Sequence, residues 1–189
     1  FNAFVSEQQQ VDEEACLSLV QFNQNIERTF HTLSLNEVVE LDHDTYIPRG
    51  TTALLDAIGE TISNNHERLA DETETQVVIV VITDGLENSS TRFKRDQIKD
   101  LINECGADRG WRFIFLAADL ASVRAGQELG IKQERAFVMG RSGEDYDRSV
   151  KMVSKKMAYM RQMKDPAHLD FTEEERRKHD SDSSRRPPG

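Results

Sequence analysis

Two short segments carry oxygen-bearing side chains at places where a ligand site could form. The segment PRGTTALLDAIG brings the hydroxyls of Thr51 and Thr52 to the predicted start of a helix, and VVIVVITDG brings the carboxylate of Asp84 to the end of an apolar strand. Open α/β sheets keep their ligand sites at the carboxyl ends of the strands. Divalent cations such as Mg²⁺ take oxygen ligands, keep several waters and often use only one or two carboxylates. If the two segments are neighbours, their oxygens would suit Mg²⁺ or Mn²⁺.

Both segments also have a purely structural interpretation. Thr51 or Thr52 could cap the helix that follows, because a hydroxyl readily accepts a hydrogen bond from a first-turn N–H group. Asp84 and Gly85 could form a turn, because Asp tolerates turn geometry and Gly supplies positive φ. The spacing alone leaves these alternatives open.

Strands and helices are predicted to alternate along most of the chain. Apolar or alternating runs predict strands, and apolar residues at helical spacing predict helices. The predicted strands are residues 16–22, 26–35, 77–82, 111–119 and 135–140. The predicted helices are residues 1–11, 36–41, 53–69, 93–105, 120–129 and 142–163, the last opened by Ser142 with Asp145 as a capping box. Fully apolar strands between helices indicate an α/β fold in three layers, with a mostly parallel sheet covered by helices on both faces.

Composition limits the function classes. The chain has 189 residues, a formal net charge of −10 and a pI near 5.0, which argues against sequence-independent nucleic-acid binding and favours cations or basic partners. Cys16 and Cys105 lack metal-type spacing and predict no disulfide framework. The acidic charge, the unpaired cysteines and the lack of an apolar run long enough to span a bilayer together predict a cytoplasmic protein. We expect one domain over residues 1–164 and a polar, disordered tail over 165–189, where Thr172 and Glu175 could cap a brief helix.

The segments GTTALLDAIG, VITDG and GWRFIFLAADL together resemble the von Willebrand factor A (vWA) domain of bacterial type, over residues 1–163. The resemblance implies a Rossmann-like sheet with a metal-ion-dependent adhesion site (MIDAS), where three loops hold a divalent cation and a partner's acidic side chain completes its coordination. By position, Thr52 matches the threonine of the second loop and Asp84 matches the aspartate of the third. The implied function is a protein-protein interaction module and not an enzyme. The implied partner is another protein that offers an acidic residue, such as an ATPase of the chaperone type.

The first loop of the family pattern, Asp-x-Ser-x-Ser, does not occur in the sequence. The chain opens on Phe1 inside a helical pattern, so we interpret it as N-terminally truncated, with one strand and its loop missing, about 10 to 20 residues by usual element lengths. Weak or absent Mg²⁺ binding by this chain follows from that interpretation. In the family the first strand lies between the strands at 16–22 and 77–82, so its loss would expose both and make the chain poorly stable or prone to aggregation.

Two other functions remain open. A magnesium-dependent hydrolase or phosphotransferase could use the same sheet edge, but it needs a general base or nucleophile near the metal, and the sequence offers no good candidate. An interaction domain with an inactive metal site is the other. Asp119 also ends a predicted strand, but it is better placed to cap the next helix. Just past Asp84, the polar residues Glu87, Asn88, Ser89 and Ser90 could shape the rim of the site or contact a partner, and turn formation explains them equally well. His43 is the only histidine with flanking carboxylates, and a solvated loop explains it better than a metal site.

Overall fold

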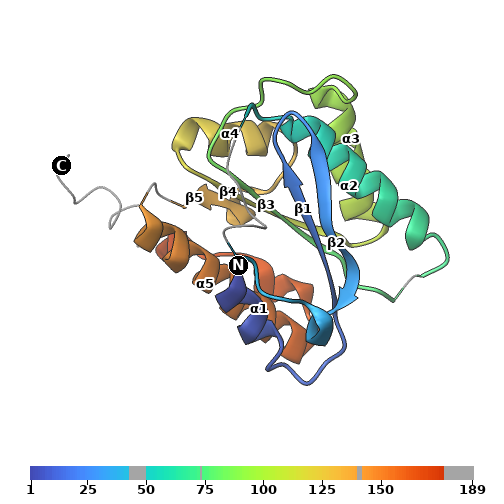
Figure 1. Ribbon diagram of the computed structural model, residues 1–189, viewed down its shortest axis with the longest axis vertical. Helices are drawn as coiled ribbons and strands as arrows, with labels where there is room; N and C mark the ends of the chain where they lie inside the picture. Colours follow the sequence, from blue (N-terminus) through green and yellow to red (C-terminus); the bar gives the residue numbers. More distant parts are fainter. Residues whose placement is uncertain (43–49, 73, 140–141, 177–189) are drawn as a thin grey trace.

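The computed structural model describes residues 1–42, 50–72, 74–139 and 142–176 and has a mixed α/β fold (Figure 1). Its strands are β1 (Cys16–Phe22), β2 (Ile26–Ser34), β3 (Val78–Thr83), β4 (Arg112–Ala117) and β5 (Ala136–Val138). Its α-helices are α1 (Asn2–Gln8), α2 (Leu54–Arg68), α3 (Arg95–Asp108), α4 (Leu120–Glu128) and α5 (Gly143–Met163), and its 3₁₀ turns are η1 (Leu35–Glu37), η2 (Gln133–Arg135) and η3 (Pro166–Leu169). Within these ranges no helix is both long and apolar enough to cross a membrane.

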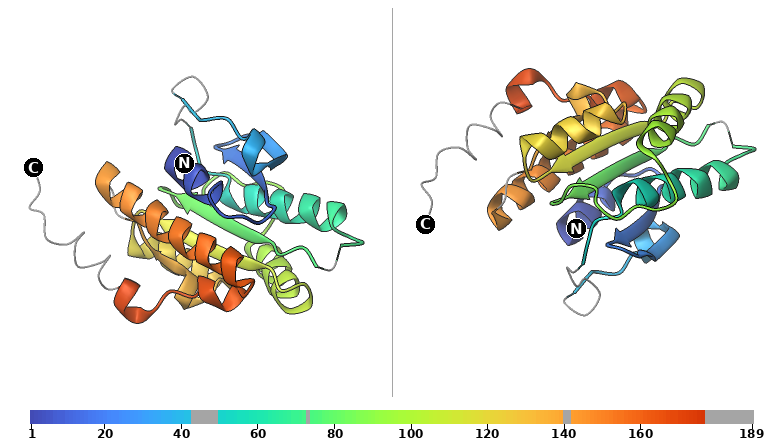
Figure 2. Two further views of the ribbon diagram at one scale, coloured as in Figure 1. Left: turned by 90° about the horizontal axis from the view of Figure 1, so that it is seen from below. Right: turned by 90° about the horizontal axis from the view of Figure 1, so that it is seen from above.

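A parallel sheet in the order β3-β4-β5 forms the centre of the fold, with helices on both faces (Figure 2). Side chains alternate across it, so each strand contributes to two apolar clusters. Ile79 and Val81 of β3 belong to the cluster formed with α2, α3 and α4. Val80 and Ile82 belong to the cluster formed with α5 and α1. This two-sided burial explains why the strands are apolar at nearly every position.

The β1–β2 hairpin is antiparallel and forms a sheet of its own. In both views of Figure 2 it lies on the side of β3 away from β4. In the part of the chain that the structure describes, β1 pairs only with β2, and β3 pairs only with β4. Only Val81 and Thr83 of β3 are buried, whereas every residue of β4 after Arg112 is buried. The mixed α/β class is therefore as predicted, but the parallel sheet has three strands and the hairpin stands apart from it.

Two helices begin with the capping chemistry predicted for them, and one predicted helix does not form. The hydroxyl of Ser142 accepts from the N–H of Asp145 at 3.1 Å, as predicted for the start of α5. Asp119 caps α4 by accepting from the N–H of Ser122 at 2.9 Å, also as predicted. The predicted helix at 36–41 is wrong, because only the turn η1 forms and the chain is already extended at Val38. Val38 and Val39 are β-branched, which disfavours a helix in so short a segment.

The folded core continues beyond residue 164, where the composition predicts a tail. Leu169 and Phe171 are 0% and 1% exposed and belong to the cluster on the α5 face. The N–H of Phe171 donates to the carbonyl of Glu134 at 2.9 Å, which fixes this segment beside η2. The predicted capping pair is present, since Thr172 and Glu175 exchange hydrogen bonds of 2.7 and 3.2 Å. Of the predicted tail, residues 177–189 lie outside the described part of the chain.

Candidate functional site

The structure brings Thr52 and the Asp84–Gly85 turn together at the carboxyl end of β3. Thr52 lies just before α2, and Asp84 directly follows β3 and is exposed. A Cβ atom added at Gly85 would lie 2.8 Å from Oγ1 of Thr52, closer than real Cβ atoms approach another atom. The glycine is therefore explained by this close contact. The expected positive φ is absent at Gly85, whose backbone lies outside the left-handed region.

Two hydrogen bonds hold the backbone of Thr52 to the loop after β3. Its N–H donates to Oδ1 of Asn88 at 2.8 Å, and its carbonyl accepts from the N–H of Asn88 at 3.1 Å. The turn itself is closed by Thr83, whose hydroxyl donates to the carbonyl of Gly85 at 3.0 Å. Within the described residues, no hydrogen bond or ion pair engages the carboxylate of Asp84. The carboxylate of Asp84 therefore takes no part in the hydrogen bonds that close the turn.

The interpretation of Thr51 or Thr52 as the cap of α2 is wrong. The N-cap residue is Ala53, which has no side chain able to accept a hydrogen bond. The first-turn N–H groups of α2 are instead satisfied by the loop after β3. The N–H of Leu55 donates to Oε2 of Glu87 at 2.8 Å, and the N–H of Asp56 donates to the hydroxyl of Ser90 at 3.1 Å. The Thr52 hydroxyl is thus not needed for capping.

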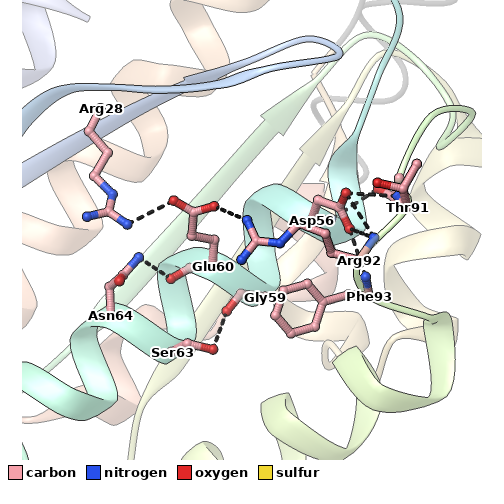
Figure 3. Close-up of polar contacts among 10 residues, drawn as sticks. Arg28, Asp56, Gly59, Glu60, Ser63, Asn64, Thr91, Arg92 and Phe93 are labelled. Atoms are coloured by element: carbon pink, nitrogen blue, oxygen red, sulfur yellow. Dashed lines mark hydrogen bonds and ion pairs between the residues drawn. The ribbon is translucent and has the colours of Figure 1, made fainter.

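Asp56 fastens the far end of the same loop to α2 (Figure 3). Its carboxylate is in the first turn of the helix and the residue is only 5% exposed. Oδ2 accepts from the N–H of Thr91 at 2.8 Å, and Oδ1 accepts from the N–H groups of Arg92 and Phe93 at 3.0 and 2.8 Å. A buried carboxylate is stable when it is surrounded by donors in this way.

Glu87 fastens the near end of the loop. Its Oε1 accepts from the N–H groups of Ser89 and Ser90 at 2.9 and 2.7 Å. Its Oε2 accepts from the N–H of Leu55, as above, and from the hydroxyl of Ser90 at 2.6 Å. We call Asp56, Glu87 and Ser90, with these bonds, the loop clamp.

The hydrogen bonds of the loop clamp lower the pKa of both carboxyl groups. Burial by itself acts to raise the pKa of Asp56, but the backbone donors Thr91, Phe93 and Arg92 outweigh it and hold that pKa below its usual value. Burial also acts to raise the pKa of Glu87, and donation from Ser90, Leu55 and Ser89 again outweighs it. Both groups are therefore anionic at neutral pH. Their charge lies at the N-terminus of α2, where the helix dipole favours it.

Further contacts tie the same region to the hairpin (Figure 3). Glu60 of α2 accepts from Arg28 of β2 at 2.9 Å and from Arg92 of the loop at 2.6 Å. The ring of Phe93 packs directly on Gly59, where an added Cβ atom would lie 2.6 Å from the ring. One face of α2 therefore contacts the hairpin and the loop after β3 at the same time.

Replacing Gly59 with Ala is expected to destabilise the protein by about 1–3 kcal/mol, although Ala is the better helix former by about 1 kcal/mol. The added methyl group would push the Phe93 ring off α2 and pull on the loop clamp. Urea unfolding of G59A beside the unaltered protein measures the change. The control is Glu67→Ala, two turns further along α2 at an exposed position, which should change stability by less than about 0.5 kcal/mol. A G59A protein more stable than the original would contradict the packing.

The arrangement can offer a cation a small set of oxygen ligands. Thr52 supplies a hydroxyl and Asp84 a carboxylate, a donor set that fits Mg²⁺ with water in the remaining positions. No group of three or more His, Cys, Asp or Glu side chains in the described ranges is placed to hold a metal ion. His43 lies outside the described residues. Asp119, the other carboxylate at the end of a strand, is occupied as the cap of α4.

Of the two carboxylates in the loop clamp, the sequence points to Glu87 only as a residue that could shape the rim of the site, and it gives Asp56 no role. A signal for Asp56 was present, because it is a carboxylate on the otherwise apolar face of α2 beside Leu55 and Ile58. Glu87 lies in the polar run directly after the Asp84–Gly85 turn, where turn formation explains the residues equally well. Neither signal identifies the partner, because each carboxylate bonds a segment more than thirty positions away.

In comparisons with known proteins, no protein-family model, no curated protein and no solved structure matches the chain.

Proposed function

We propose that this protein is a non-enzymatic interaction module that binds a partner protein through a divalent cation held by Thr52 and Asp84. One observation carries the proposal. The Thr52 hydroxyl, which does not cap α2, lies against the turn that bears Asp84, whose carboxylate has no partner among the described residues. Two oxygen ligands from separate segments thus share the carboxyl edge of β3, where α/β folds place their ligands.

The chemistry of such a site is binding. A bound Mg²⁺ would supply positive charge at an otherwise acidic edge, and an acidic side chain of the partner could then complete its coordination. Thr52 would contribute a neutral ligand and Asp84 a charged one. The engagement of Asp119 in capping α4 favours this function over hydrolysis or phosphotransfer, because Asp119 is the other carboxylate that directly follows a strand of the central sheet and it is already occupied. The resemblance to the vWA domain is the only support for an ATPase of the chaperone type in the cytoplasm as the partner.

We extend the proposal to the fold, as a Rossmann-like fold of vWA type. In that fold a further strand lies between the strands that correspond to β1 and β3. Two features support it: β1 and β3 belong to separate sheets, and most side chains of β3 are only partly buried. The ligands of an Asp-x-Ser-x-Ser loop would belong to that further strand, so we propose that the described residues provide two of three loops.

The test is calorimetric titration of Mg²⁺ into the full product of the gene, unaltered and as Thr52→Ala and Asp84→Ala. Each substitution removes one ligand, so each is expected to weaken Mg²⁺ binding at least about tenfold, or about 1.4 kcal/mol. Asp84→Ala should have the larger effect, because it removes a charge. The matched control is Thr51→Ala, which alters the neighbouring exposed hydroxyl and should leave affinity within about twofold. Equal binding by all four proteins would refute the proposal.

A further inference from the structure

We propose that Asp56, Glu87 and Ser90, the loop clamp, are positioning residues that set the distance between Thr52 and Asp84 and thereby the cation affinity of the site. This inference rests on the proposed function. It adds a role for three residues that themselves contact no ligand. It also implies that the cation affinity depends on hydrogen bonds between residues that are not themselves ligands.

The two ligands need such a device because they belong to different parts of the fold. Thr52 lies before the first turn of α2, and Asp84 belongs to the loop that leaves the central sheet. In the described residues no strand pairing joins these two segments, so their spacing depends on one backbone bond, from the N–H of Asn88 to the carbonyl of Thr52, and on side-chain bonds. Those bonds run from Asn88 to Thr52 and from the loop clamp to the first turn of α2 and to residues 91–93. Removing them would let the loop move relative to α2.

The carboxylates of the clamp act through position, because their acceptor capacity is already used. A carboxylate has about four lone-pair sites. Those of Asp56 face the N–H groups of residues 91–93, and those of Glu87 face Leu55, Ser89 and Ser90. Neither carboxylate has a free side for a metal ion. Their proximity to the site therefore points to support of Thr52 and Asp84.

Ser90 is the member that connects the backbone of Asp56 to the carboxylate of Glu87. Its hydroxyl accepts from the N–H of Asp56 at 3.1 Å and donates to Oε2 of Glu87 at 2.6 Å. One oxygen atom thus joins the start of α2 to the near end of the loop. Removing the hydroxyl of Ser90 would weaken the loop clamp without adding bulk or removing a charge. Binding sites lose affinity when their ligands are displaced by about half an ångström, so a loosened loop should be measurable as weaker Mg²⁺ binding.

The adjacent serine provides a matched control. The hydroxyl of Ser89 is buried and has no hydrogen-bond partner among the described residues, so Ser89 contributes only its backbone to the clamp. Ser89→Ala and Ser90→Ala remove the same atom from neighbouring positions of one loop. Two measurements on the full product of the gene compare them with the unaltered protein: calorimetric Mg²⁺ affinity, and amide hydrogen exchange in the absence of metal. Glu87→Gln serves as a second clamp variant.

We expect Ser90→Ala to weaken Mg²⁺ binding about five- to tenfold and Ser89→Ala to change it less than about twofold. Ser90→Ala should also speed amide exchange in residues 84–93 but not in β4, which shows that the fold is intact. Glu87→Gln should act in the same direction, because an amide can accept on only one of its two terminal atoms. If S90A and S89A have equal affinity and equal exchange, the clamp is refuted while the proposed function stands. If the unaltered protein binds no Mg²⁺, the proposed function is refuted, and the positioning role with it.

Discussion

Replacing Asp56 with Ala is expected to lower the free energy of unfolding by about 3 kcal/mol, one of the two largest effects predicted for this protein. The substitution leaves the N–H groups of Thr91, Arg92 and Phe93 without their acceptor. Each hydrogen bond to a charged group contributes about 1.5–3 kcal/mol, and the three are not additive because water can reach part of the loop. Urea unfolding followed by circular dichroism measures the difference.

The control for this substitution is Asp84→Ala, which removes a carboxylate from the same region at an exposed position. It should change the free energy of unfolding by less than about 0.5 kcal/mol. A similar small effect for both variants would mean that Asp56 does not hold the loop.

Acid should remove the same stabilisation. Asp56 and Glu87 have pKa values below their usual range in the folded protein, so the unfolded chain takes up protons first as the pH falls. Their contribution is fully present above the unfolded pKa values near 4 and is lost as the pH falls through the lower folded values. The stability difference between the unaltered protein and D56A should therefore be constant from about pH 6 to 8 and narrow below about pH 4. A difference that persists unchanged at pH 3 would contradict the assignment of charge.

Replacing Phe171 with Ala is expected to cost about 3–5 kcal/mol, the usual range for a buried aromatic ring. Phe171 is 1% exposed, its ring centroid lies 4.8 Å from that of Phe137, and the ammonium group of Lys156 lies 5.0 Å from the ring centroid. The substitution would leave a cavity on the α5 face of the central sheet. Thermal and urea unfolding both report the loss.

A control from the same face is Met163→Ala, because Met163 is 51% exposed and should contribute less than about 1 kcal/mol. If F171A unfolds like M163A, then the segment after α5 is not part of the cooperative core. The comparison therefore tests where the folded domain ends.

The sequence predicted most strands and helices because their residues are buried in a regular pattern. β4 is apolar at each position after Arg112, and both of its faces are covered by helices, so its apolar run was sufficient evidence for a central strand. The start of α5 was predictable because Ser142 and Asp145 are local partners. Signals of this kind depend on neighbours only a few positions apart.

The features that escaped prediction depend on distant partners. The first turn of α2 is satisfied by Glu87 and Ser90, so its own sequence shows no cap and wrongly suggested Thr51 or Thr52. Leu169 and Phe171 are apolar residues in a polar stretch, and only the place of η3 beside α5 reveals that they are buried. The pairing of Thr52 with Asp84 could be proposed from the sequence only as a conditional statement about neighbouring elements.

The capping of α2 by residues of a distant loop has a consequence for how the protein folds. A helix that carries its own cap can begin to form early, since all the groups involved are close in sequence. The first turn of α2 can instead be capped only after the loop that follows β3 has come into contact with it. That contact closes a loop of more than thirty residues, and the loss of chain entropy precedes the formation of the hydrogen bonds. The candidate site should therefore be among the last parts of the molecule to form during refolding and among the first to open.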